Sequence, residues 1–244
     1  MITFETVLIV AGALAGGFVN GLTGFGTALS AMPFWLHAVS PAVAAQLAAA
    51  GAVIGHVQAL PTFWHTIRWR ELAPYVVAGL AGVPLGVWLL PHVSVRAFKL
   101  GVGAVLVAYC GFMLVDRGRL RISGGGRAAK ALVGFCGGLL GGVAGLSGPL
   151  PTVWASLLGL SMDAKRTLFL AFNCTVLCAM LAVSAALGLM TTDFLAAFAF
   201  ALPGSLIGAR LGQWVYMRLD QRRFDAVVLA LLMLSGVTLL WSNL

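Results

Sequence analysis

Long apolar runs separated by short charged gaps are the feature that most constrains how this chain of 244 residues can fold. A helix that crosses the hydrocarbon core of a bilayer needs about 20 apolar residues, and the runs here have roughly that length or more. Hydrophobic residues make up 61% of the chain and charged residues 9%, a balance that excludes a soluble protein of this size. The sequence therefore predicts an all-α polytopic membrane protein without a separate soluble domain. The candidate segments are 3–38, 42–63, 73–90, 95–115, 128–160, 164–188, 194–216 and 222–241.

Two of these segments, 3–38 and 128–160, are too long for one crossing and are interrupted near the middle by glycines. The first contains GGFVNGLTGFGTALSAMPFW and the second GFCGGLLGGVAGLSGPLPTVW. Glycine interruptions in an apolar stretch are typical of a re-entrant or discontinuous helix, whose irregular backbone is buried in protein or lines a cavity. An alternative is that these glycines form ordinary packing faces, because small residues four apart let helices approach closely.

The order of features in the first half of the chain is repeated in the second half. A shift of 121 positions places Gly17 on Gly138, Gly21 on Gly142 and Gly24 on Gly145, and a shift of 122 places Gly82 and Gly86 on Gly204 and Gly208. Each half is then one broken segment followed by three plain spans. We expect a first transmembrane repeat at 1–116, a basic linker at 117–127 and a second transmembrane repeat at 128–244.

Basic residues indicate how the segments thread through the bilayer, because cytoplasmic loops are rich in Lys and Arg. If all eight segments crossed, the 14 Lys and Arg residues other than Arg210 would divide seven against seven. If each broken segment instead returns to the face that it entered, 12 lie on one side and only Arg96 and Lys99 on the other. This arrangement has three crossings in each half, so the halves run in opposite directions as inverted repeats. It places the linker 117–127 in the cytoplasm and both termini outside the inner membrane.

The first break supplies a candidate anion site. A helix that begins inside the membrane presents unpaired backbone N–H groups and the positive end of its dipole, and both favour an anion. The stretch Thr23, Gly24, Phe25, Gly26 and Thr27 would leave N–H groups near Gly26 free, and a hydroxyl of Thr23 or Thr27 would lie beside them.

The second break has the same character. It runs from Gly145 through Ser147 and Gly148 to Pro149, with Ser147 as a candidate helix cap and Pro149 suited to the first helical turn. Two helix starts related by inversion would meet near the middle of the membrane. We therefore expect them to form one oxyanion site together.

Four of the other polar residues within the predicted spans are candidates for the same site. Asn20 and Asn173 could donate an amide hydrogen bond to an anion, although interhelical hydrogen bonds need no ligand. Arg210 is the single basic residue within a span, where burial is costly, but its side chain could also reach the cytoplasmic edge. His56 is the one titratable side chain well inside a crossing and is a candidate for proton coupling.

The sequence also limits the chemistry. All seven Asp and Glu residues fall at segment ends, so no carboxylate is placed in the membrane interior for an ion relay. The chain has no G-x-x-x-x-G-K-[ST] loop for ATP, and its His and Cys residues lack metal-ligand spacing. We expect no metal, no cofactor and no nucleic acid. The expected partners are a small anion and the lipid bilayer, and a homo-oligomer is left open.

The two broken segments, GGFVNGLTGFG and GGLLGGVAGLSGP, together with a G-x-x-x-G in the third element of each half, resemble the TauE/SafE family of sulfite and organosulfonate exporters, also called 4-toluene sulfonate uptake permeases. The resemblance covers essentially the whole chain. It implies an inner-membrane permease for a small sulfur-containing or carboxylate anion. The chain departs from the family's usual glycine triplet after the first break, where it has Gly26, Thr27 and Ala28.

Two functions from different classes follow. The first is a secondary transporter that moves a small anion, such as sulfite or an organosulfonate, by alternating access. The second is an intramembrane thiol-redox enzyme that uses Cys174 and Cys178, which share one helix face at a spacing of four. No second redox motif and no catalytic acid accompany these cysteines, so the sequence favours the transporter.

Overall fold

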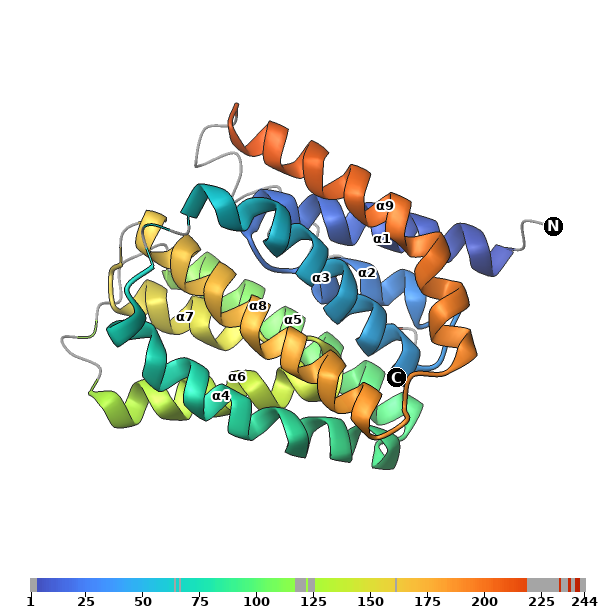
Figure 1. Ribbon diagram of the computed structural model, residues 1–244, viewed down its shortest axis with the longest axis horizontal. Coiled ribbons are helices and arrows are strands. Elements are labelled where there is room, and N and C mark those ends of the chain that lie inside the picture. Colours follow the sequence, from blue (N-terminus) through green and yellow to red (C-terminus); the bar gives the residue numbers. More distant parts are fainter. Residues whose placement is uncertain are drawn as a thin grey trace.

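A computed structural model of the chain describes residues 4–63, 65, 67–116, 122, 126–160, 162–218, 233, 237 and 240–241. The elements of this part of the chain are helices, in agreement with the all-α prediction (Figure 1). In chain order they are α1 (Phe4–Thr23), α2 (Thr27–Trp35), α3 (Pro41–Phe63), α4 (Trp69–Leu89), the 3₁₀ turn η2 (Leu90–His92), α5 (Val95–Asp116), α6 (Arg127–Ala144), α7 (Pro149–Leu157), α8 (Met162–Ala186) and α9 (Thr192–Tyr216). Most of the predicted linker 117–127 and of the predicted span 222–241 lies outside the described residues.

Each glycine-rich segment forms a long helix followed by a short helix that turns back. In the first segment α2 runs back along α1, and the indole N–H of Trp35 donates to the carbonyl of Ile9 at 2.9 Å. Gly26 (φ +97°) in the first break and Gly145 (φ +66°) in the second adopt the left-handed conformation, which glycine reaches without the strain that a Cβ would cause. The predicted breaks are therefore present, as the pairs α1 with α2 and α6 with α7.

The glycines that precede each break have a different role, in helix packing. Gly17 of α1 faces the backbone of α9, where an added Cβ would lie 2.6 Å from the carbonyl oxygen of Ser205. Gly138 of α6 faces the backbone of α4 at Gly79 in the same way. Figure 1 shows α1 beside α9 at one edge of the bundle and α4 beside α6 at the opposite edge. Both interpretations of the glycine-rich segments thus hold, each for a different part of the segment.

The contacts of these helix pairs fix how the two halves correspond. Gly208 of α9 faces Leu14 of α1, and Gly82 of α4 faces Phe135 of α6. Phe135 is 121 positions after Leu14, so Gly82 corresponds to Gly208 and the offset between α4 and α9 is 126. The predicted shift of 122, which pairs Gly82 with Gly204, is wrong by about one helical turn. Glycines spaced four apart match about equally well in either register, so the sequence could not distinguish them.

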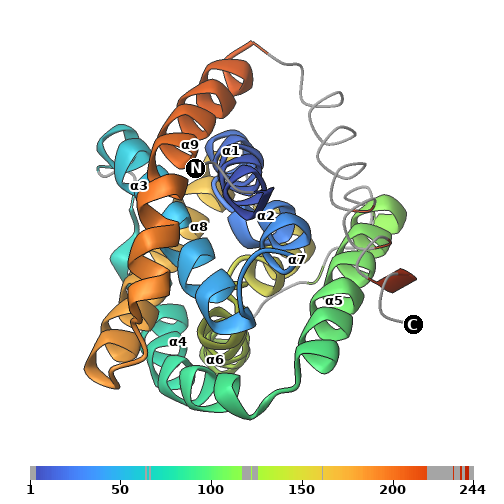
Figure 2. The same ribbon diagram turned by 90° about the vertical axis from the view of Figure 1, so that its right-hand side faces the viewer.

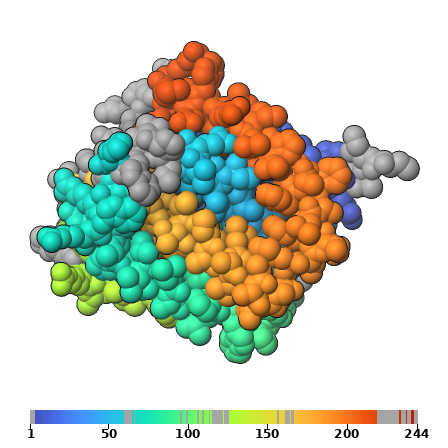
Figure 3. Space-filling view, viewed as in Figure 1, coloured from blue at the N-terminus to red at the C-terminus, as the bar shows by residue number. Residues whose placement is uncertain are grey.

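The two central helices, α3 and α8, are antiparallel. The side-chain amide of Gln46, near the start of α3, donates to the carbonyl of Leu189, just after the end of α8, at 3.0 Å. Figure 3 shows α3 and α8 side by side on one face of the molecule, between α4 and α9. Equivalent helices that run in opposite directions are what an inverted repeat requires. The inverted relation of the halves across a bilayer stays a prediction, and this geometry supports it.

The outer surface of the bundle is apolar, as expected for a protein in lipid. Trp69 and Trp88 at the two ends of α4 are 55% and 60% exposed. A helix rises about 1.5 Å per residue, so the two indoles lie roughly 28 Å apart along the axis, close to the ~30 Å of a bilayer's hydrocarbon core. Tryptophan is enriched at membrane interfaces. The spacing of the pair along α4 therefore fits the distance between the two interfaces of a bilayer.

Six of the described helices are long and apolar enough to cross a membrane. They are Phe4–Thr23, Pro41–Ala59, Trp69–His92, Arg127–Ala144, Thr167–Ala186 and Thr192–Tyr216. The chain is therefore a multi-pass membrane protein. Two of the six are α1 and α6, so the long arm of each broken segment reaches spanning length, while α2 and α7 bring the chain back.

The packing glycines give a test of the fold. We expect Gly138→Ala to destabilise the protein by about 1–3 kcal/mol, because the new Cβ would meet the backbone of α4 and force two helices apart. The matched control is Gly101→Ala in α5, where a Cβ meets nothing within 4 Å among the described residues. Thermal unfolding of the purified protein in detergent measures both. Equal unfolding midpoints for the two variants would contradict the close packing of α6 on α4.

Candidate functional site

The starts of α2 and α7 face one small cavity in the middle of the bundle. Figure 2 shows α2 and α7 surrounded by the longer helices. The cavity has a volume of about 10 Å³, room for about one water molecule. Its lining consists of Phe25, Gly26, Thr27, Ala28, Leu29, Ala52, His56, Gly145, Leu146, Ser147, Gly148, Pro149, Asn173 and Leu177. The two breaks therefore lie side by side, as the sequence predicts.

The start of α2 is the richer source of hydrogen-bond donors. Its first helical bond runs from the N–H of Ser30 to the carbonyl of Gly26 at 3.1 Å, so the N–H groups of Thr27, Ala28 and Leu29 have no acceptor within the helix. No side chain caps this end of α2. The hydroxyl of Thr27 is also without a partner among the described residues, although Thr27 is only 1% exposed. These groups can donate to an oxyanion together.

The start of α7 contributes fewer donors than expected. Its first bond runs from the N–H of Thr152 to the carbonyl of Gly148 at 3.0 Å, and Pro149 and Pro151 carry no N–H. Leu150 is thus the one donor in the first three positions of this helix. The site is therefore asymmetric, and α2 supplies most of its backbone donors.

Ser147 does not cap α7 as predicted. Its hydroxyl donates instead to Oδ1 of Asn173 on α8 at 2.8 Å, and both side chains are 1% exposed. A carbonyl oxygen that accepts this bond leaves the amide nitrogen of Asn173 to face other groups. The pair thus orients the amide of Asn173 at the edge of the cavity.

Three predicted site residues hold the first break instead of lining the cavity. The amide of Asn20 donates to the carbonyl of Ala52 at 3.1 Å and ties α1 to α3. The hydroxyl of Thr23 lies 2.9 Å from the carbonyl of Val19 and accepts from the N–H of Phe25 at 3.1 Å. The carbonyl of Gly24 accepts from His56 at 3.0 Å. These contacts fix the backbone in which the α2 donors are presented.

Arg210 lies on the exposed face of α9 and does not line the cavity. Its neighbour Ala209 faces inward instead, toward Gly21 and Gly55. One helical position turns a side chain by about 100°, so the inward face of α9 carries small residues and Arg210 points away from it.

The lining residues form pairs related by the shift of 121. Both members of each pair contribute to the cavity although they come from different halves of the chain. The pairs are Phe25 with Leu146, Gly26 with Ser147, Thr27 with Gly148, Ala28 with Pro149, Ala52 with Asn173, and His56 with Leu177. In the pairs that contain a polar side chain, one member is polar and the other is small or apolar.

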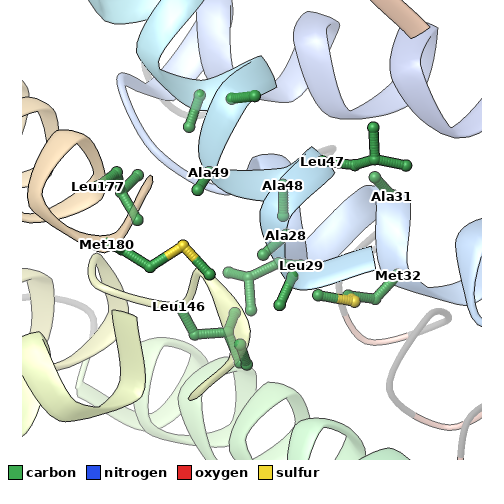
Figure 4. Close-up of a cluster of buried hydrophobic side chains, with 14 of the residues drawn as sticks. Ala28, Leu29, Ala31, Met32, Leu47, Ala48, Ala49, Leu146, Leu177 and Met180 are labelled. Carbon is green, nitrogen blue, oxygen red and sulfur yellow. The ribbon is translucent and has the colours of Figure 1, made fainter. Parts of the chain in front are cut away.

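The apolar part of the lining was not foreseen from the sequence. Phe25 packs against Gly148, where an added Cβ would lie 3.0 Å from the Phe25 ring, and contacts Phe169 edge to face with ring centroids 5.7 Å apart. Leu29 and Leu146 belong to a cluster of buried side chains beside the cavity (Figure 4). In a chain this apolar, no local signal separates such residues from ordinary core.

A second cavity of about 460 Å³ lies at one end of the bundle, where α4, α6 and α8 begin. We call this the basic end, because Arg68 and Lys130 line that cavity. Thr167 of α8 also lines it and precedes Asn173 by six residues, about 9 Å along the helix. Phe169 lies between them on α8. Phe169, whose ring contacts Phe25 of the small cavity, thus stands on α8 between a residue that lines the larger cavity and one that lines the small cavity.

Comparison with known proteins decides the class. The family model described as "Sulfite exporter TauE/SafE" matches residues 8–239. The chain belongs to the TauE/SafE family. Searches of curated proteins and of solved structures each gave no match. TauE/SafE proteins are transporters, so this chain is a membrane transporter and not an enzyme.

The thiol chemistry considered as the alternative has no place in this TauE/SafE chain. Cys174 and Cys178 are free cysteines on α8, and neither lines the cavity. Cys178 is exposed on the outside of the bundle. Within the described part of the chain, no three His, Cys, Asp or Glu side chains lie close enough together to hold a metal ion.

The left-handed glycine at the start of α2 gives a test of the site. We expect Gly26→Ala to lower anion affinity about ten-fold or more, because a Cβ at φ +97° strains the backbone and turns the α2 N–H groups away. The control is Gly188→Ala, which has φ +66°, no atom within 4 Å of the new Cβ among the described residues, and no place in the cavity. Calorimetric titration with sulfite measures affinity, and thermal unfolding measures stability. If Gly26→Ala and Gly188→Ala lost similar stability and similar anion affinity, the start of α2 would be excluded as the site.

Proposed function

We propose that this TauE/SafE transporter binds a small sulfur oxyanion, sulfite or an organosulfonate, at the start of α2 and moves it across the inner membrane by alternating access. The observation that carries the proposal is a buried helix start at a small cavity, with three N–H groups and one hydroxyl that lack partners among the described residues. A related small carboxylate would use the same donors.

The chemistry of the lining favours an anion over a cation. Helix N-termini carry roughly +0.5 of an elementary charge, and two of them face this cavity. No Asp or Glu side chain lines it. Buried donors without acceptors are costly in a membrane interior, and an oxyanion is a ligand that satisfies several of them at once. A cation would find two opposing dipoles and few acceptors.

The closed geometry supports alternating access. A sulfur oxyanion has several heavy atoms, so a cavity of about 10 Å³ must widen to accept it. Toward the basic end, we infer that the contact of Phe25 with Phe169 closes the path to the larger cavity. Elsewhere Leu29, which lines the cavity, belongs to a cluster of buried side chains with Met32 and Met180 (Figure 4). Movement of the two breaks, at the starts of α2 and α7, past first one and then the other of these groups of side chains would open the cavity to one side of the membrane at a time.

We propose that the basic end faces the cytoplasm and that the termini lie outside. Single cysteines introduced as Gly126→Cys and Ser40→Cys, in a variant without the four native cysteines, test this. Both positions are exposed and lie at opposite ends of the bundle. The new thiol of Ser40→Cys should react with an impermeant maleimide added to intact cells. The new thiol of Gly126→Cys should react only after the membrane is opened. The reverse labelling pattern would contradict the orientation and the inverted-repeat prediction.

Transport in proteoliposomes tests the function. Purified protein should catalyse counterflow of labelled sulfite or methanesulfonate, and Thr27→Val should reduce affinity about ten-fold or more. Valine has nearly the shape of threonine, but it lacks the hydroxyl, and a hydrogen bond to a charged group is worth about 1.5–3 kcal/mol.

Two variants control for this experiment. Thr175→Val removes a hydroxyl that donates within α8 to the carbonyl of Ala171 at 2.8 Å, outside the cavity. Arg210→Lys keeps the charge but removes the planar fork that recognises oxyanions. Both should transport within about two-fold of the unchanged protein. A large loss in Arg210→Lys with normal affinity in Thr27→Val would move the site away from α2.

A further inference from the structure

His56 of α3 is a titratable group built into the anion cavity. It is 1% exposed and lines the cavity together with the start of α2. Its ring nitrogen Nε2 lies 3.0 Å from the carbonyl oxygen of Gly24. The other ring nitrogen, Nδ1, has no hydrogen-bond partner among the described residues. Nε2 thus holds the ring in place, and Nδ1 stays available for a ligand.

The contact with Gly24 fixes where the first proton sits. A carbonyl oxygen can only accept, so Nε2 carries the hydrogen of the neutral ring. Nδ1 then presents a lone pair, which repels an anion in the cavity. A second proton on Nδ1 turns this nitrogen into a donor and gives the ring a positive charge. Anion and proton therefore favour each other at this site.

Among the described residues, no other charged group lines the cavity. The lining residues that the two breaks, α2, α7 and α8 place around His56 carry no ionisable side chain. On α9, Ala209 lies against Gly55, and the adjacent Arg210 is exposed. A protonated His56 without an anion would be a buried charge without a counter-ion, and the anion without the proton would lack a full positive charge nearby.

From this geometry we propose that the transporter binds its anion together with one proton, carried on Nδ1 of His56. The proposal rests on the function proposed above. The proton enters from the aqueous phase that also supplies the anion, stays on Nδ1 while the cavity is closed, and leaves with the anion on the other side. A monoanion then crosses without net charge, and the gradients of anion and proton together set the direction.

Proton counting by titration calorimetry tests this proposal. Sulfite and methanesulfonate are titrated into the detergent-purified protein in two buffers that differ in ionisation enthalpy, between about pH 6 and pH 9. Methanesulfonate keeps a fixed charge in this range, so any proton taken up with it belongs to the protein. We expect about one proton per anion at the alkaline end, and an affinity that falls about ten-fold per pH unit there.

The variants separate His56 from other groups. In His56→Asn the amide nitrogen can take the place of Nδ1 as a donor that does not titrate, so binding should persist and its pH dependence should disappear. His92→Asn is the control, because His92 is exposed beyond α4 and bonds the carbonyl of Trp88 at 2.9 Å. It should keep the proton uptake of the unchanged protein. With sulfite, the difference in proton uptake between His92→Asn and His56→Asn gives the number of protons that the protein takes up at His56.

Each outcome decides one question. Failure of the unchanged protein to bind either anion overturns the proposed function. Binding without proton uptake over the whole pH range leaves the function standing and overturns the coupling. Equal proton uptake in His56→Asn overturns the assignment of the proton to His56. If His56→Asn is unstable, proteoliposomes loaded with a pH-sensitive dye still test the proton coupling. Methanesulfonate entry through the unchanged protein should acidify the interior. An unchanged internal pH would contradict the coupling.

Discussion

A backbone N–H group without a partner costs on the order of several kcal/mol inside a bilayer, and the rest of this structure depends on that constraint. The chain interrupts a helix twice within the membrane and so creates such groups at the start of α2 and, to a smaller extent, of α7. They are tolerable only where protein surrounds them. Figure 2 shows this enclosure, with the long helices around α2 and α7. Close packing at glycines, of α1 on α9 and of α4 on α6, holds these surrounding helices together.

The polar residues around the first break follow from the same constraint. Asn20 and Thr23 bond the backbone of α3 and of the turn itself, so they satisfy groups that the break leaves open. Among the described residues that line the cavity, the groups without a partner are the α2 N–H groups, the Thr27 hydroxyl and Nδ1 of His56, while Oδ1 of Asn20 outside the cavity also has none. The division between structural and ligand-facing polar groups is therefore a division by position around the turn. The type of a residue does not show which of these two roles its polar group has.

This division explains how much of the site the sequence could predict. Gly26, Thr27, Gly145, Ser147, Gly148, Asn173 and His56 were all identified from the breaks and the rare polar positions, and all line the cavity. Asn20, Thr23, Gly24 and Arg210 do not, because their roles depend on the path of the turn and on the rotation of α9, which spacing alone does not determine. Helix existence and the two breaks were predictable from apolar length and glycine. The register of α4 against α9 was not, since glycines recur every four residues in both helices.

The pairing of cavity residues by the shift of 121 gives a reason for the asymmetry of the site. A single small anion bound between two related halves cannot use two copies of every group, because there is room for only one ligand. Thr27 is therefore matched by Gly148, His56 by Leu177 and Asn173 by Ala52. Histidine at both positions of the pair would place two titratable rings around one charge. With leucine at position 177, the cavity contains a single titratable ring, so the proposed stoichiometry of one proton per anion rests on a position where the two halves differ.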